Sequence, residues 1–258
     1  MTQHTQTKSA SWNQGLLIFI YLAVLTGLEF FIALTMDSAP LLVLMALVKA
    51  ALVLYYYMHV YRLNEEDAGH DHHSLYFKTG TNRLGLWLFL LSDSFVFGGL
   101  MVTRINLLGL TRPELNQLLG LGVTAVLLIS SFFMNRGETA MAHGDRKAFV
   151  MNTAVTLVLG VAFLVGVVAV EWQTAIHEGL TPDSGAPGAV FFMMTGMHAF
   201  HVLTGVIFLI VVLRNGLRGL YSEEKHWAVE AAAVYWHFID VVWIFFYPAL
   251  YLIGKAVL

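Results

Sequence analysis

The stretch Val190–Leu213, VFFMMTGMHAFHVLTGVIFLIVVL, contains 24 residues and no Asp, Glu, Lys or Arg. An α-helix rises about 1.5 Å per residue, so about 20 apolar residues cross the hydrocarbon core of a bilayer. Six further stretches are long and apolar enough to do the same. The seven expected spans are Asn13–Thr35, Leu41–Tyr61, Arg83–Thr103, Leu115–Asn135, Phe149–Val170, Val190–Leu213 and Ala228–Ile253. The sequence therefore predicts an all-α fold, a polytopic integral membrane bundle of seven transmembrane helices.

Composition leads to the same class of protein and excludes several others. The 258 residues are 58% hydrophobic and 12% charged, whereas ordinary soluble domains are about 25% charged. The net charge is −3 and no basic run exists to contact phosphates, so we expect no nucleic-acid partner. There is no cysteine, which excludes disulfides, iron–sulfur clusters, and zinc or copper sites that need a thiolate.

The positive charges predict how the chain is oriented. Ten of the fourteen Lys and Arg residues fall on the side that carries the N-terminus, three fall on the opposite side, and Lys49 lies within a span. Short cytoplasmic connections carry an excess of Lys and Arg. We therefore expect the N-terminus inside and the C-terminus outside.

Two ionisable residues lie within the first two expected spans, which the short connection MDSAP joins into an antiparallel hairpin. Glu29 lies roughly 9 Å from the outer end of the first span, and Lys49 lies roughly 12 Å from that end on the second. These similar depths predict a Glu29–Lys49 ion pair, or contacts from each to a partner subunit. In the alternative, each side chain extends separately to the outer interface.

Five further ionisable residues fall near the bilayer midplane, at depths of roughly 14 to 22 Å. They are Asp93, His198, His201, His237 and Asp240. A charge at this depth costs about 2.5–3.5 kcal/mol on insertion scales, so each residue needs a partner or a function. Two pairs are three residues apart on one helix and share a face. We expect one polar belt across the third, sixth and seventh spans.

Three interpretations of the belt compete. A metal or haem site is the weakest, because a lone H-x-x-H is little evidence for one, and we expect no metal bound by this chain. A proton-handling pathway would use Asp93, a carboxyl group that desolvation can keep protonated. On chemistry alone the belt is best explained as structural, with hydrogen bonds that lock three helices together.

Three ordered motifs then identify a family. They are RLGLWLFLLSDSFVFGG (Arg83–Gly99), FFMMTGMHAFHVLTG (Phe191–Gly205) and EAAAVYWHFIDVVWIF (Glu230–Phe245). Together they resemble subunit III of the haem-copper terminal oxidases, the cytochrome c oxidases and their quinol-oxidising relatives. The resemblance covers the chain from Arg83 to the C-terminus.

The resemblance implies a subunit that binds no haem or copper itself. Its partners would be catalytic subunit I, which holds the haem and copper, and subunit II. Asp93 matches the family's intramembrane carboxylate, and an aspartate here is similar to the quinol-oxidase branch. Glu171 matches the glutamate at the outer end of the fifth span. His198 and His201 match the family's histidine pair, although Ala199 replaces a usual glycine.

The resemblance also implies bound structural phospholipid. Arg214 and His226 match positions at which the family contacts lipid headgroups. Glu230, at the inner end of the last span, matches the last-helix signature together with His237 and Asp240.

The first two spans depart from the family pattern. VKAALVLYYYMHV (Val48–Val60) is similar to a motif of the small bacterial oxidase subunit IV. We therefore expect three parts: a subunit IV-like two-helix hairpin (1–61), a polar, histidine-containing linker (62–82) and a five-helix subunit III-like bundle (83–258). A plain seven-helix subunit III is the alternative.

The function that follows is a non-catalytic subunit of a proton-pumping oxidase in a bacterial plasma membrane. It would support subunit I, proton uptake and bound lipid, with cytochrome c as the favoured electron donor. The alternatives are a quinol oxidase subunit III, a nitric-oxide reductase accessory subunit and a stand-alone proton-coupled transporter.

Overall fold

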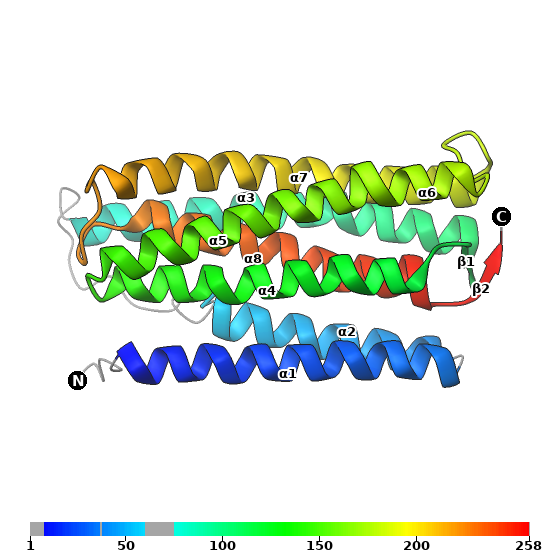
Figure 1. Cartoon of the computed structure of the whole chain (residues 1–258), viewed down its shortest axis with the longest axis horizontal. Helices are drawn as coiled ribbons and strands as arrows, with labels where there is room; N and C mark the ends of the chain where they lie inside the picture. Colours follow the sequence, from blue (N-terminus) through cyan, green and yellow to red (C-terminus); the bar gives the residue numbers. More distant parts are fainter. Residues whose placement is uncertain (1–7, 37, 60–74, 258) are drawn as a thin grey trace.

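The computed structural model describes residues 8–36, 38–59 and 75–257. Seven helices of the described residues are long and apolar enough to cross a membrane. They contain the elements α1 (Lys8–Thr35), α2 (Ala39–Leu52), α3 (Leu75–Leu108), α4 (Gln117–Ala142), α5 (Arg146–Leu164), α7 (Ala186–Leu217) and α8 (Trp227–Tyr247). The helices run nearly side by side, with the start of α1 and the strand after α8 at opposite ends (Figure 1). The predicted all-α membrane bundle of seven spans is therefore confirmed, while the cytoplasmic side stays a prediction from charge.

Three spans contain π-helical turns at or next to one end. These are η1 (Val53–Tyr57), η3 (Val165–Glu171), which continues into α6 (Trp172–His177), and η4 (Pro248–Leu252). Pro248 has no N–H to donate, and its carbonyl accepts from Ile253, five residues on, at 2.8 Å. Glu171 and Tyr251, two residues of the candidate site, lie in these turns.

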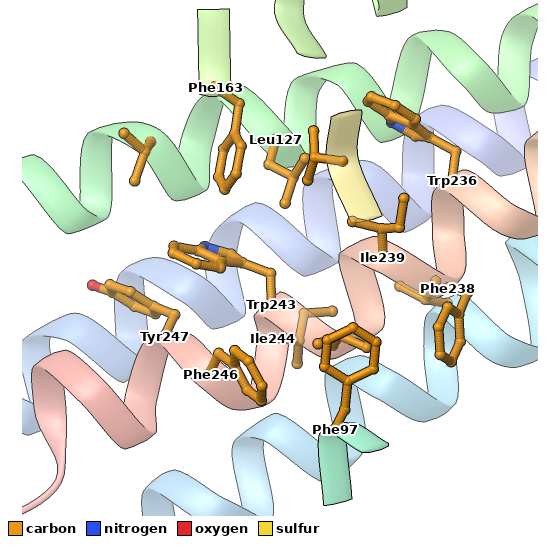
Figure 2. Close-up of a cluster of buried hydrophobic side chains, with 14 of the residues drawn as sticks. Phe97, Leu127, Phe163, Trp236, Phe238, Ile239, Trp243, Ile244, Phe246 and Tyr247 are labelled. Carbon is orange, nitrogen blue, oxygen red and sulfur yellow. The ribbon is translucent and has the colours of Figure 1, made fainter. Parts of the chain in front are cut away.

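Helix α8 is the centre of the bundle. Of its most apolar stretch 78% is buried within the chain, against 11% for α3, which is therefore a peripheral helix. Aromatic rings from α8, including Trp243 and Phe246, pack with Phe163 of α5 and Phe97 of α3 (Figure 2). Gly205 allows α7 to approach closely, because a β-carbon there would lie 3.1 Å from the ring of Trp236.

The hairpin of α1 and α2 packs against α4 and α8 rather than standing apart (Figure 1). The hydroxyl of Tyr57 donates to the carbonyl of Gly15 at 2.9 Å and ties the two helices together. Most of the expected linker 62–82 lies outside the described residues. Its last part differs from the prediction, since residues from Leu75 onward already belong to α3. The first turns of α3 continue the backbone hydrogen bonds of the apolar span, because adding a residue to an existing helix is far easier than starting a new one.

Two short strands, at the end of the bundle where α3 passes into α4, were not predicted. Strands β1 (Thr111–Pro113) and β2 (Lys255–Val257) pair in parallel, with Thr111 opposite Lys255. Arg104 holds them from the end of α3. Its guanidinium donates to the carbonyls of Ala249, Gly109, Thr111 and Ile253 at 2.6–3.0 Å. The buried cation is thus stabilised by four carbonyl dipoles.

Candidate functional site

Asp93 and His201 form a pair between α3 and α7, each near the middle of its span. His201 Nε2 lies 3.0 Å from Asp93 Oδ2. The other ring nitrogen, Nδ1, lies 2.8 Å from the carbonyl of Met197, so it carries a proton and donates it. Nε2 is close enough to the carboxyl group for an ion pair, although Asp93 Oδ2 makes no hydrogen bond of good geometry within the described part of the chain. This pair has the chemistry to hold and release a proton at membrane depth.

His237 and Asp240 form a second pair, on α8. His237 Nδ1 lies 2.8 Å from the Ser131 hydroxyl of α4 and 3.4 Å from Asp240 Oδ2. The ring of Tyr57 packs on His237 at 4.9 Å between centroids. This pair consequently joins the last helix to α4 and to the hairpin.

His198 belongs to neither pair. It is buried, and neither ring nitrogen has a hydrogen-bond partner within the described part of the chain. Its ring lies 4.8 Å from Trp243 and 5.6 Å from Phe163 between centroids. Two side chains that are three residues apart on a helix point in directions about 60° apart. His201 therefore faces α3, whereas His198 faces α5 and α8. The five residues of the predicted belt therefore form two separate pairs and one residue surrounded by aromatic rings.

Lys49 and Glu29 lie together in the hairpin. Lys49 Nζ is 2.5 Å from Glu29 Oε2, and both side chains are almost fully buried. The similar depths argued from the sequence thus correspond to direct contact between α1 and α2. Neither side chain extends separately to the interface.

The two carboxylates near the ends of spans also have partners. Glu171, at the end of η3, accepts a hydrogen bond from the Tyr251 hydroxyl of η4. Glu230, in the first turn of α8, faces Arg83 of α3, whose Nη2 and Nε lie 3.0 and 3.1 Å from Glu230 Oε1. Both carboxylates link helices that are distant in sequence.

Arg214 lies at one side of an apolar groove of about 420 Å³ on the surface of α5 and α7. Arg218 lines the groove one turn further on, and Leu157 and Ile210 form part of its wall. His226 precedes α8, and its Nδ1 lies 3.2 Å from the carbonyl of Ser222. The groove combines cationic and apolar lining, as a lipid headgroup with its acyl chains requires.

Sequence reasoning missed the hydroxyl groups of α4. Thr124 accepts the indole N–H of Trp243 at 2.9 Å, and Ser130 accepts that of Trp236 at 3.1 Å. Ser131 contacts His237. Hydroxyl residues recurring within an apolar span are the signal that could have found this face, because such groups bond across helices.

No group of three or more His, Asp or Glu side chains able to hold a metal occurs among residues 8–36, 38–59 and 75–257. His70, His72 and His73 of the expected linker lie outside the described residues. Apart from His198, the buried ionisable residues of the site lie in pairs that can stabilise helix packing or hold protons.

Comparison with known proteins adds to this geometry. A family model described as cytochrome c oxidase subunit III matches residues 2–255. Cytochrome c oxidase subunit 3 of Oryctolagus cuniculus is 32% identical over 231 residues, covering 84% of this chain and 86% of the relative. The same subunit of Synechocystis is 34% identical over 193 residues, covering 71% and 79%. A probable quinol oxidase subunit 3 of Staphylococcus saprophyticus is 34% identical over 183 residues, covering 68% and 90%.

Proposed function

Because this chain belongs to the cytochrome c oxidase subunit III family, we propose that it is the non-catalytic subunit III of a proton-pumping haem-copper oxidase that reduces oxygen to water in aerobic respiration. Its partners are subunit I, which holds haem and copper, and subunit II. The bacterial relatives support a place in a bacterial plasma membrane. The seven spans and the paired ionisable residues of the bundle suit a supporting subunit.

The Asp93–His201 pair carries the proposal that this subunit supports proton uptake. It lies on α3 and α7, and its two side chains are 16% and 10% exposed in the isolated chain. A carboxyl group at this depth is costly as a bare charge, and the adjacent imidazole can accept or return its proton. The pair can thus buffer a proton at the edge of the bundle, where α3 is little covered by the rest of the chain.

The test is Asp93→Asn in the assembled oxidase. We expect steady-state turnover at alkaline pH to fall severalfold, or catalytic lifetime to shorten, because the amide cannot exchange a proton with His201. The matched control is Asp183→Asn, which removes an exposed carboxylate between α6 and α7. An assembled Asp93→Asn oxidase with unchanged turnover and lifetime would leave Asp93 a structural residue only.

Cytochrome c is the proposed electron donor, and quinol is the second candidate. Cytochrome c is supported by the names of the rabbit and Synechocystis relatives. Quinol is supported by the aspartate at position 93 and by the name of the Staphylococcus relative. Comparing the oxygen consumption of the purified complex with reduced cytochrome c and with quinol decides between them.

The groove beside Arg214 supports a role in holding phospholipid. We expect the guanidinium to pair with an anionic headgroup while the apolar wall contacts the acyl chains, and His226 to lie at the same headgroup level. Arg214→Ala should lower the phospholipid retained by the purified complex without changing its haem spectrum. Lys225→Ala, which removes another exposed cation near His226, is the control. Equal lipid content in the Arg214→Ala complex would contradict this role.

A further inference from the structure

The turn of α7 that carries His201 is held by two hydroxyl groups in series. The Thr204 hydroxyl donates to the main-chain carbonyl of His201 at 2.8 Å, and the Tyr235 hydroxyl of α8 lies 2.7 Å from Thr204 Oγ1. A hydroxyl group has one proton, so Thr204 cannot also donate to Tyr235, and Tyr235 is the donor between them. The Tyr235 hydroxyl is 3.5 Å from the carbonyl of His201 itself, which is too long for a strong O–H···O bond. Tyr235 therefore acts on this turn through Thr204.

Helices α7 and α8 approach each other closely beside these hydroxyl groups. Gly205, the next residue of α7, would place a β-carbon 3.1 Å from the ring of Trp236 and from Ile239 Cδ1. The ring of Tyr235 also reaches toward α3, where it lies 6.5 Å from Phe89 between centroids. Close packing resists small displacements of the side chains that take part in it. The bond from Tyr235 consequently ties α7 to α8 at a point where the two helices cannot easily shift.

The imidazole of His201 contacts its own helix through one nitrogen and Asp93 through the other. Nδ1 donates to the carbonyl of Met197 at 2.8 Å, and Nε2 lies 3.0 Å from Asp93 Oδ2. This second contact lacks good hydrogen-bond geometry, because Asp93 Oδ2 makes no such bond within the described part of the chain. A hydrogen bond weakens steeply as its atoms lose alignment. The position of α7 against α3 therefore decides how well Nε2 and the carboxyl group can exchange a proton.

The titratable groups around this pair differ in the direction they face. Tyr235 approaches the His201 turn from α8, whereas His237 and Asp240 of the same helix lie on the side of α4. His198 of α7 faces α5 and α8. Charged groups nearer the two ends of α3 have partners of their own, namely Arg83 with Glu230, and Arg104 with main-chain carbonyls. Tyr235 is thus the titratable residue of α8 that bonds toward the turn carrying His201.

We propose that Tyr235 is a positioning residue for the Asp93–His201 pair. Through Thr204 it holds the turn that carries the imidazole in place against α3, and so it sets how readily the pair exchanges a proton. The Tyr235 hydroxyl acts only as a hydrogen-bond donor and does not itself give up its proton. This role rests on the proposed function of the pair in proton uptake.

The first test is the pH dependence of oxygen consumption by the assembled oxidase with Tyr235→Phe, which keeps the ring and removes the hydroxyl. We expect turnover at alkaline pH, where protons are scarce, to fall about threefold, the effect of losing one hydrogen bond, while turnover at neutral pH changes little. Tyr21→Phe is the matched control, because it removes an exposed hydroxyl from α1, and it should keep the wild-type profile. A wild-type profile for Tyr235→Phe would overturn the proposal.

Two variants of Thr204 separate hydrogen bonding from packing, and they do not depend on the assembly of Tyr235→Phe. Thr204→Val keeps nearly the same volume and removes the hydroxyl, whereas Thr204→Ser keeps the hydroxyl and removes the methyl group. We expect Thr204→Val to show the alkaline loss and Thr204→Ser to keep the wild-type profile. The opposite order would show that packing alone matters at this position, and it would overturn the proposal.

Combination with Asp93→Asn distinguishes this role from the proposed function of the pair. Without the carboxyl group His201 has no partner with which to exchange a proton, so adding Tyr235→Phe should cause no further alkaline loss. A further threefold loss in the double variant would show that Tyr235 acts elsewhere and would refute the positioning role alone. An Asp93→Asn complex with unchanged turnover and lifetime would refute the role of the pair in proton uptake, and the positioning role with it.

Discussion

At the scale of single residues, buried ionisable groups in this chain are stabilised in different ways. Lys49 and Glu29 are neutralised by direct contact, whereas Arg104 has carbonyl oxygens as its partners. The carbonyls that Arg104 contacts come from the residue after α3, from β1, from η4 and from the residue that follows η4. This one side chain therefore holds the segment that follows α8 against the end of α3.

Replacement of Arg104 tests that conclusion. Arg104→Met should destabilise the protein by about 3 kcal/mol or more, because several carbonyls lose a charged donor at once. The measurement is the thermal unfolding midpoint of the purified complex. Lys255→Met is the control, since it removes an exposed cation from the adjoining strand β2. Equal midpoints for the two variants would show that the Arg104 contacts add no stability.

At the scale of elements, the hairpin of α1 and α2 is bound to the body through polar as well as apolar contacts. The Tyr57 ring contacts His237, and Lys49 and Asp240 line one small cavity. Packing of this kind makes the hairpin an integral part of the bundle. Whether it derives from a subunit IV-like protein stays a prediction from the motif Val48–Val60.

The Glu29–Lys49 ion pair in the hairpin leads to a prediction that is controlled by a double variant without either charge. Lys49→Leu leaves Glu29 buried without its cation and should destabilise the hairpin by about 3–5 kcal/mol, the cost of breaking a buried pair on one side. The double variant Glu29→Gln with Lys49→Leu removes both charges and should recover most of that loss.

The readouts for these variants are the amount of chain retained in the purified complex and the half-life of the complex at raised temperature. A Lys49→Leu variant that matches the wild type would show that the pair contributes nothing. A double variant as unstable as Lys49→Leu would show that charge is not the cause of the loss.

At the scale of the whole molecule, the seven spans could be predicted because apolar length is a local property of the sequence. The depth of a residue in the membrane could be predicted for the same reason, from its distance along the span. Glu29 and Lys49 have similar depths and were therefore expected to form a pair. The rotation of each helix about its axis is set by packing with its neighbours. His198 therefore lies among Phe163 and Trp243 rather than with His201 and Asp93.

Other features depend on contacts that no short motif contains. Strands β1 and β2 have three residues each and are far apart in the sequence, since Thr111 pairs with Lys255. Arg104 holds them together. Helix α3 starts inside the expected polar linker because its first turns extend from the span. The cavity between α2 and α8 likewise exists only once the hairpin has packed, so no local pattern of residues could predict it.

The central claim is that this chain is subunit III of a respiratory oxidase, and purification from native membranes tests it most directly. A carboxy-terminal affinity tag on this chain is used to isolate its complex, and the reduced-minus-oxidised absorption spectrum and oxygen consumption are recorded. We predict haem a or haem b bands from a co-purified subunit I, and oxygen consumption driven by reduced cytochrome c or quinol. A chain that purifies alone, with no haem absorption and no oxygen consumption, would contradict the account.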